Sequence, residues 1–329
     1  MKRRTVLAAL CGLATALAAS AVAAGASAAC KLSLIGAPVP ITFDHNRPVI
    51  AAFIDGKPVR ALVDTGASIS LLFRGSATRM GLRLDTVSGL RMYGAGGATS
   101  VQAATIDLRI AGAERRGMRI VVAGERPMDV DMLLGQDILQ QADVEYDFAN
   151  HTLRLLDAQN CADSDMPYWA SRYDEAALLP AGAQDEHLIV DVKLNGHATR
   201  AILDTGAAIS VASPALAAAA GVPLRDAGAM SGLGSAAVAV KLGVVKRLQV
   251  GGEVIPDATL AFGDLFGRAT YGETGSLLPQ KEDAPADMLL GSDFFAAHRV
   301  LVSPSHRKMF FSYNGGPAFP GPGGPAPAK

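Results

Sequence analysis

The sequence has few aromatic residues, few cysteines and almost no net charge. Only 5% of its 329 residues are aromatic, and 30 Lys and Arg stand against 31 Asp and Glu, a formal net charge of −1. Proteins that bind nucleic acid or anionic membranes normally carry an excess or a stripe of basic residues. This chain has neither, so we expect no nucleic-acid partner.

Signals for metals and cofactors are also missing. The six histidines show no paired spacing of the kind that metal ligands have. Residues 232–237 read Gly-Leu-Gly-Ser-Ala-Ala, which formally fits a dinucleotide fingerprint. That fingerprint requires a strand–helix–strand setting, whereas residues 238–250 have the pattern of strands. We therefore expect no metal and no cofactor.

A long apolar run occurs at the N-terminus. Lys2, Arg3 and Arg4 precede an Ala- and Leu-rich stretch over 6–24, and residues 26–28 are small, as at a cleavage site. This pattern predicts a secretory signal peptide over 1–29, and hence export to the periplasm or the medium, with no stable membrane span in the mature chain. Ser27 stands where a lipoprotein signal has a larger apolar residue, which leaves lipidation of Cys30 as the minor alternative.

Three cysteines are present, and Cys11 leaves with the signal peptide. Cys30 and Cys161 then form the one possible pair in an oxidising compartment. We favour a disulfide between them, because an exported free thiol is a liability. The alternative is two unrelated thiols.

What the chain does have is internal repetition. Residues 54–64 align without gaps on 194–204, residues 131–137 match 287–293, and the glycine-rich stretch 92–97 matches 230–235. The second copy carries an insertion within 263–283. These matches divide the mature chain into a first lobe over 30–157, a linker over 158–184, a second lobe over 185–315 and a disordered Gly/Pro tail over 316–329.

The pattern within each copy is that of short strands. Apolar runs at 49–54 and 59–63 flank Asp55-Gly56, a hairpin signal. Residues 105–110 alternate between apolar and polar, 118–122 resemble a strand, and 147–156 form a hairpin pattern. Residues 132–139 suggest a buried strand that breaks at Gly135 into a short helix, and 77–82 suggest a helical turn. The sequence thus predicts an all-β fold.

Each copy delivers one carboxylate from the end of an apolar strand into a Thr-Gly turn. Asp64 and Asp204 occupy these equivalent positions, at the edge of a core where an unpaired charge is costly. Two adjacent carboxylates cannot both ionise cheaply, so one holds a proton and the other stays anionic. Such a pair can remove a proton from water and donate one to a carbonyl oxygen.

With its two Asp-Thr-Gly-Ala motifs and two Leu-Leu-Gly motifs, the chain resembles retropepsin-like aspartic proteases, with two tandem copies in one chain. The resemblance implies a bilobal fold of two related β-barrel-like lobes with a cleft between them, a peptide or protein substrate, and a monomer with an intramolecular dyad. It implies endopeptidase activity. The alternative is an exported, non-catalytic peptide-binding or assembly module.

The resemblance also assigns roles to individual residues. The catalytic pair would be Asp64 and Asp204, supported by Thr65, Gly66, Ala67, Thr205, Gly206 and Ala207. The flaps would contain Tyr93, Gly94, Gly96, Gly232 and Gly234. Tyr93 is either a substrate contact or an exposed hairpin aromatic. We further expect Asp137 and Asp293 to cap short helices rather than to act in catalysis.

Overall fold

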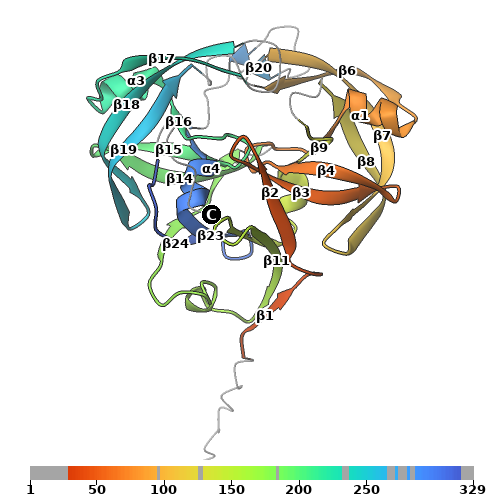
Figure 1. Ribbon diagram of the computed structural model, residues 1–329, viewed down its shortest axis with the longest axis horizontal. Helices are drawn as coiled ribbons and strands as arrows, with labels where there is room; N and C mark the ends of the chain where they lie inside the picture. The colour runs from red at the N-terminus through yellow and green to blue at the C-terminus, as the bar shows by residue number, and fades with distance from the viewer. Residues whose placement is uncertain are drawn as a thin grey trace, which may run out of the picture.

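The computed structural model describes residues 29–319 except 95–96, 125–128, 183–184, 232–236, 265–270, 273–279 and 282–285. Most elements are strands, and the four α-helices are short, so the predicted all-β fold is confirmed. Figure 1 shows the two halves side by side, with strands of both halves between and below them. Among the described residues, none of the helices has the length and apolar character needed to cross a bilayer.

The first half contains ten strands and two helices after the N-terminal strand β1 (Lys31–Leu34). They are β2 (Val39–Asp44), β3 (Arg47–Ile54), β4 (Lys57–Val63), β5 (Leu71–Phe73), α1 (Arg74–Met80), β6 (Asp85–Gly94), β7 (Gly97–Ile110), β8 (Ala113–Ala123), β9 (Met132–Leu134), α2 (Gln136–Leu139), β10 (Asp143–Asp147) and β11 (Thr152–Gln159). Helix α1 begins three residues before the predicted turn at 77–82. It ends at Met80, and the following Gly81 caps it in the left-handed backbone conformation with φ 69°.

The second half repeats this order. Its elements are β14 (Asp185–Leu194), β15 (His197–Asp204), β16 (Val211–Ala212), α3 (Pro214–Ala219), β17 (Arg225–Ser231), β18 (Ala237–Val250), β19 (Glu253–Gly263), β22 (Met288–Gly291), α4 (Ser292–Ala297), β23 (His298–Ser303) and β24 (Lys308–Tyr313). The predicted insertion at 263–283 lies largely outside the described residues, which include only its short strands β20 (Tyr271–Gly272) and β21 (Gln280–Lys281).

The hairpin that leads to each Thr-Gly turn has the predicted form. Asp55 and Gly56 join β3 to β4 with φ of 50° and 74°, and Asn195 and Gly196 join β14 to β15 with φ of 50° and 89°. Two consecutive positive φ angles are what a two-residue hairpin turn requires, and Asp-Gly and Asn-Gly adopt them readily. These turns set the register that brings Asp64 and Asp204 to equivalent places.

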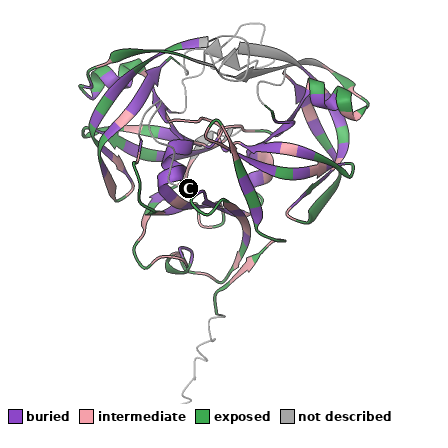
Figure 2. Ribbon diagram, in the orientation of Figure 1, coloured by how far each residue is buried: buried purple, intermediate pink, exposed green. Residues whose placement is uncertain are grey.

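The two halves share a sheet that the sequence analysis did not predict. Strand β10 of the first half pairs antiparallel with β23 of the second, and the strand order β12-β24-β23-β10-β11 continues into the first lobe. One cluster of buried apolar side chains runs through both halves, and Tyr146 of β10 packs edge-on against Phe295 of α4. Figure 2 shows buried residues concentrated in both lobes and in these shared strands. The halves therefore form one packed body.

The predicted linker over 158–184 is more ordered than expected. It contains the 3-10 turn Asp163–Asp165 and strands β12 (Asp174–Ala177) and β13 (Leu179–Gly182), which pair with β24 and β14. Its aromatic residues pack on the body, and Trp169 Nε1 donates to Ser312 Oγ at 2.8 Å. Cys30 and Cys161 are joined in a disulfide, which ties β1 to this segment. The composition indicated a linker because its strands are too short to show a period.

The predicted disordered tail over 316–329 is also wrong in part. Phe319 is buried at 2% exposure and its ring lies 6.4 Å from that of Phe294, so residues up to 319 fold back onto the second half. Residues 320–329 lie outside the described range. Burial of one large aromatic ring outweighs the low structural tendency of the surrounding Gly and Pro residues.

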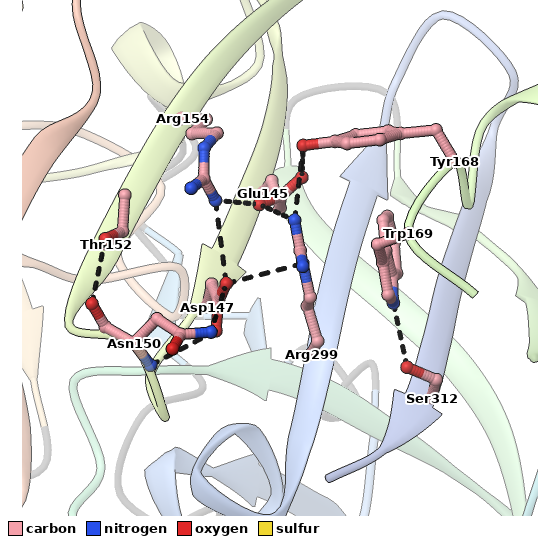
Figure 3. Close-up of polar contacts among 9 residues, drawn as sticks. All are labelled: Glu145, Asp147, Asn150, Thr152, Arg154, Tyr168, Trp169, Arg299 and Ser312. Atoms are coloured by element: carbon pink, nitrogen blue, oxygen red, sulfur yellow. Dashed lines mark hydrogen bonds and ion pairs between the residues drawn. The ribbon is translucent and has the colours of Figure 1, made fainter.

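A buried carboxylate fastens the shared sheet (Figure 3). Glu145 of β10 is fully buried and accepts hydrogen bonds from Arg154, from Tyr168 Oη and from Arg299 Nη2, the last at 2.9 Å. Arg299 belongs to β23 of the second half, and its guanidinium carbon lies 4.9 Å from the centre of the Trp169 ring. One arginine thus joins the first half, the second half and the intervening segment.

We expect Arg299→Met to lower the free energy of unfolding by about 3 kcal/mol, because it breaks a buried ion pair and leaves part of the Glu145 charge uncompensated. The matched control is Lys246→Met, which removes an ion pair with Asp257 that is exposed on both sides. That change should cost less than about 1 kcal/mol. Equal losses in chemical denaturation would contradict this account of the shared sheet.

Candidate active site

Asp64 and Asp204 come together where the two halves meet. Asp64 directly follows β4 and Asp204 is the last residue of β15, and these strands pair with the parallel neighbours β9 and β22. Their carboxylates hydrogen-bond one another, and each accepts backbone N–H groups from its own turn, such as Gly66 N to Asp64 Oδ1 at 3.1 Å and Ala207 N to Asp204 Oδ1 at 3.0 Å. The structure thus brings together the two carboxylates that the sequence analysis singled out.

Thr65 and Thr205 lock the two turns to each other. Thr65 Oγ1 donates to the carbonyl of Leu203 at 2.8 Å and accepts from Thr205 N at 2.9 Å. In return, Thr205 Oγ1 donates to the carbonyl of Val63 at 2.6 Å and accepts from Thr65 N at 3.1 Å. Both threonines are fully buried, so these four bonds are not exchanged with water. They have the interlocking geometry that the resemblance implies.

Gly66 and Gly206 make room for the opposite carboxylate. A Cβ at Gly66 would lie 2.8 Å from Asp204 Oδ2 and closer still to its other carboxylate atoms. A Cβ at Gly206 would meet Asp64 in the same way. Any side chain at either position would push the two carboxylates apart. Here the requirement for glycine is close approach, since neither residue has a positive φ.

The repeated Leu-Leu-Gly motif supports the turns from behind. A Cβ at Gly135 would lie 2.8 Å from the Ala67 carbonyl oxygen, and one at Gly291 would lie 2.6 Å from that of Ile209. The residue after each glycine binds a threonine carbonyl: Gln136 Nε2 donates to Thr65 O and Ser292 Oγ to Thr205 O, both at 2.7 Å. The motif therefore holds the backbone of each Thr-Gly turn in place.

Asp137 and Asp293 do not occupy the cap positions of their helices, although Asp293 Oδ1 accepts from Phe294 N in the first turn of α4 at 2.9 Å. The residues at the cap positions are Gly135 and Gly291, with no side-chain cap bond. Instead, Asp137 accepts from Ser70 N and Oγ at 2.8 and 2.6 Å, and Asp293 accepts from Ser210 N and Oγ at the same distances. Each serine Oγ accepts in turn from the motif glycine N–H. The repeated Ser and Asp pairs carried this signal, which the capping interpretation missed.

The electrostatic environment favours one shared proton. Burial, followed by the charge of Asp204, raises the pKa of Asp64 well above its usual range. Burial also raises the pKa of Asp204, but N–H donors from Ala207 and Gly206, the charge of His187 and the bond from Asp64 act in the opposite direction. The site therefore favours a singly protonated pair, in which one carboxyl donates to the other, ionised one.

The predicted flap residues are only partly within the described range. Tyr93 and Gly94 are the last two residues of β6, and Gly94 pairs with Gly97 of β7, which gives the expected hairpin backbone. Gly96, Gly232 and Gly234 lie outside the described residues. In the part of the chain that is described, no three His, Cys, Asp or Glu side chains gather as they would around a metal ion.

Comparison with known proteins agrees with this architecture. A family model described as an aspartyl protease matches residues 50–138 and 190–294, together more than half of the chain. The chain belongs to the aspartyl protease family. The two matched segments are the two tandem copies, so this part of the sequence prediction is confirmed.

Among solved structures, this chain is similar to the EIAV protease complexed with the inhibitor HBY-793. The identity is 29%, the match covers 29% of this chain and 86% of that chain, and the TM-score is 0.25. No curated protein matches the sequence.

We expect Thr65→Val to lower the free energy of unfolding by about 3 kcal/mol, because Thr205 N–H and the Leu203 carbonyl would be left buried without partners. Thr65→Ser retains the hydroxyl and loses one methyl group, so it should cost about 1 kcal/mol. Denaturant unfolding measures both. The interlock would not be the stabilising feature if the serine variant lost as much as the valine variant.

Asp64→Asn should stabilise the folded chain at neutral and alkaline pH. A carboxyl whose pKa is raised by folding penalises the folded state above its unfolded pKa, and the penalty grows until pH passes the folded pKa. Asn removes that penalty, so the gain in melting temperature should shrink as pH falls and vanish below about pH 4. The exposed Asp191→Asn should give no such trend. A gain that is constant with pH would refute the assignment.

Proposed function

We propose that this member of the aspartyl protease family is an aspartic endopeptidase that hydrolyses peptide bonds with water activated between Asp64 and Asp204. The observation that supports it best is the half-buried, hydrogen-bonded carboxylate pair, held by threonines from both halves. Bringing two carboxylates together out of bulk water costs stability, and such pairs cluster at functional sites.

The proposed reaction uses the two carboxyls in different roles. Asp204, ionised, takes a proton from the water as its oxygen attacks the peptide carbonyl carbon, while Asp64 donates its proton to the carbonyl oxygen. A neutral tetrahedral diol results, with Asp204 protonated and Asp64 ionised. Asp64 then takes a hydroxyl proton from the diol as Asp204 gives its proton to the leaving nitrogen. The C–N bond breaks, and both carboxyls return to their initial states.

The proposed substrate is an extended peptide that pairs by β-strand addition with the hairpins β6–β7 and β17–β18. In Figure 1, β6 and β17 lie at the upper edge of the molecule, on either side of the junction between the halves. Because both aspartates belong to one chain, the dyad would be complete in a monomer.

We also infer that the protease acts outside the cytoplasm. The predicted signal peptide over 1–29 motivates this proposal, and the Cys30–Cys161 disulfide is the kind of bond that persists in an oxidising compartment. Detection of the mature chain, beginning near Cys30, in periplasm or culture medium would test it. Finding only the full-length chain in the cytosol would reject it.

Asp64→Asn and Asp204→Asn should each reduce cleavage of a peptide library by about 10³-fold or more, because each variant removes one of the two proton-transfer groups. A statine-type inhibitor should block the unchanged chain, and Asp191→Asn should cleave normally. An active single Asn variant would contradict one intramolecular dyad. Peptide binding without turnover by the unchanged chain would instead support the non-catalytic module.

A further inference from the structure

The two copies place different basic residues at one equivalent position beside the dyad. Arg47, the first residue of β3, lies as many residues before Asp64 as His187 of β14 lies before Asp204. The strand registers pair Val49 with Leu62 and Ile189 with Ile202. Beyond these pairs, the charge of Arg47 acts on Asp64 and the charge of His187 acts on Asp204. One carboxylate thus faces a permanent cation and the other a titratable imidazole.

His187 also reaches across to the turn of the other half. Its Nε2 lies 3.0 Å from the carbonyl oxygen of Gly66, and Ser68 Oγ lies 3.4 Å from each ring nitrogen. A carbonyl oxygen only accepts, so Nε2 must carry a hydrogen in both charge states. The proton that His187 gains and loses is therefore the one on Nδ1. The bond to the first turn can persist while the charge changes.

The charge of His187 acts on the dyad directly. A positive His187 lowers the pKa of Asp204, as Arg47 lowers that of Asp64. Among the described elements that pack against β14, α2 carries Asp137, which accepts hydrogen bonds from Ser70, and β12 carries Asp174 and Glu175. Strand β13, on the other edge, carries no charged residue, and Asp185 and Glu186 precede His187 in the chain.

A titratable cation affects the two proton-binding steps of a carboxyl pair unequally. When it is charged, it makes the first ionisation of the pair easier and thus extends the singly protonated state to lower pH. A cation that remained charged would also ease the second ionisation. It would therefore lower the upper pH limit of the singly protonated state. An imidazole loses its charge near pH 6.5 in its ordinary range, and so it can assist the first step without promoting the second.

We propose that His187 is a positioning residue that widens the pH range over which Asp64 and Asp204 share one proton. Arg47 is charged throughout and shifts both steps together, whereas His187 acts at the acidic end alone. The inference rests on the proposed function for its biological meaning, since the singly protonated pair is the form that would cleave peptides. The titration itself does not depend on cleavage.

The test is a carboxyl ¹³C NMR titration of the full chain labelled at aspartate, with signals assigned through Asp64→Asn and Asp204→Asn. The glutamine of His187→Gln has no cationic form. In this variant the pH midpoint of the first ionisation should rise by about one unit, and that of the second ionisation should not change. In His187→Arg the lower step should stay and the upper step should move down by a similar amount. Arg47→Gln should raise both steps.

Two outcomes would overturn the proposal. In one, His187→Gln and His187→Arg both titrate like the unchanged chain. In the other, both variants shift the same step in the same direction, as a purely structural disturbance would do. His197→Gln, at an exposed position at the start of β15, is the matched control and should leave both steps in place.

The pH profile of peptide cleavage separates this proposal from the proposed function. If the chain cleaves peptides, the acidic limb of the kcat/KM profile should shift to higher pH in His187→Gln. The alkaline limb should shift to lower pH in His187→Arg. If the NMR steps shift as expected and no peptide is cleaved, the endopeptidase assignment fails and the role of His187 stands.

Discussion

The four hydrogen bonds between the Thr65 and Thr205 turns are the interaction on which the rest of the structure depends. Each threonine hydroxyl binds backbone of the other half, so neither turn has a complete set of partners alone. The bonds hold Asp64 and Asp204 close enough to share a hydrogen bond. Without this interlock, repulsion and the cost of burial would separate the two carboxylates.

An arrangement that crowds two half-buried carboxylates must be stabilised elsewhere. Three layers of contacts do so: the Leu-Leu-Gly motifs behind the turns, the shared strands β10 and β23, and the Glu145 cluster that binds Arg299. The motif glycines and the turn glycines serve the same purpose, because each removes a side chain where two backbones or a backbone and a carboxylate approach closely. Activity at such a site and stability of the fold are therefore in conflict, and the outer layers resolve it.

The sequence was most informative where local chemistry decides the structure and duplication marks it. The Asp55-Gly56 hairpin, the strand break at Gly135 and the meeting of Asp64 with Asp204 were all predictable on those grounds. The pairing of β10 with β23 was not, because long-range strand pairing leaves no local pattern. Strands β12 and β13 are too short for a period to appear. The role of Asp137 was missed because the Asp at the start of each short helix was interpreted as a cap, without regard to the equally repeated Ser70 and Ser210.

The shared sheet has a consequence for how the chain is made. The first half alone leaves β10 with an unpaired sheet edge, because its partner β23 lies some 150 residues further along the chain. Its Thr65 hydroxyl likewise lacks an acceptor until Leu203 has emerged. A first half without its second half is therefore incomplete and exposes an unpaired strand edge. Two such halves from neighbouring chains can pair with each other in place of their own second halves. Fusing two copies in one polypeptide raises the local concentration of the correct partner and so disfavours that exchange.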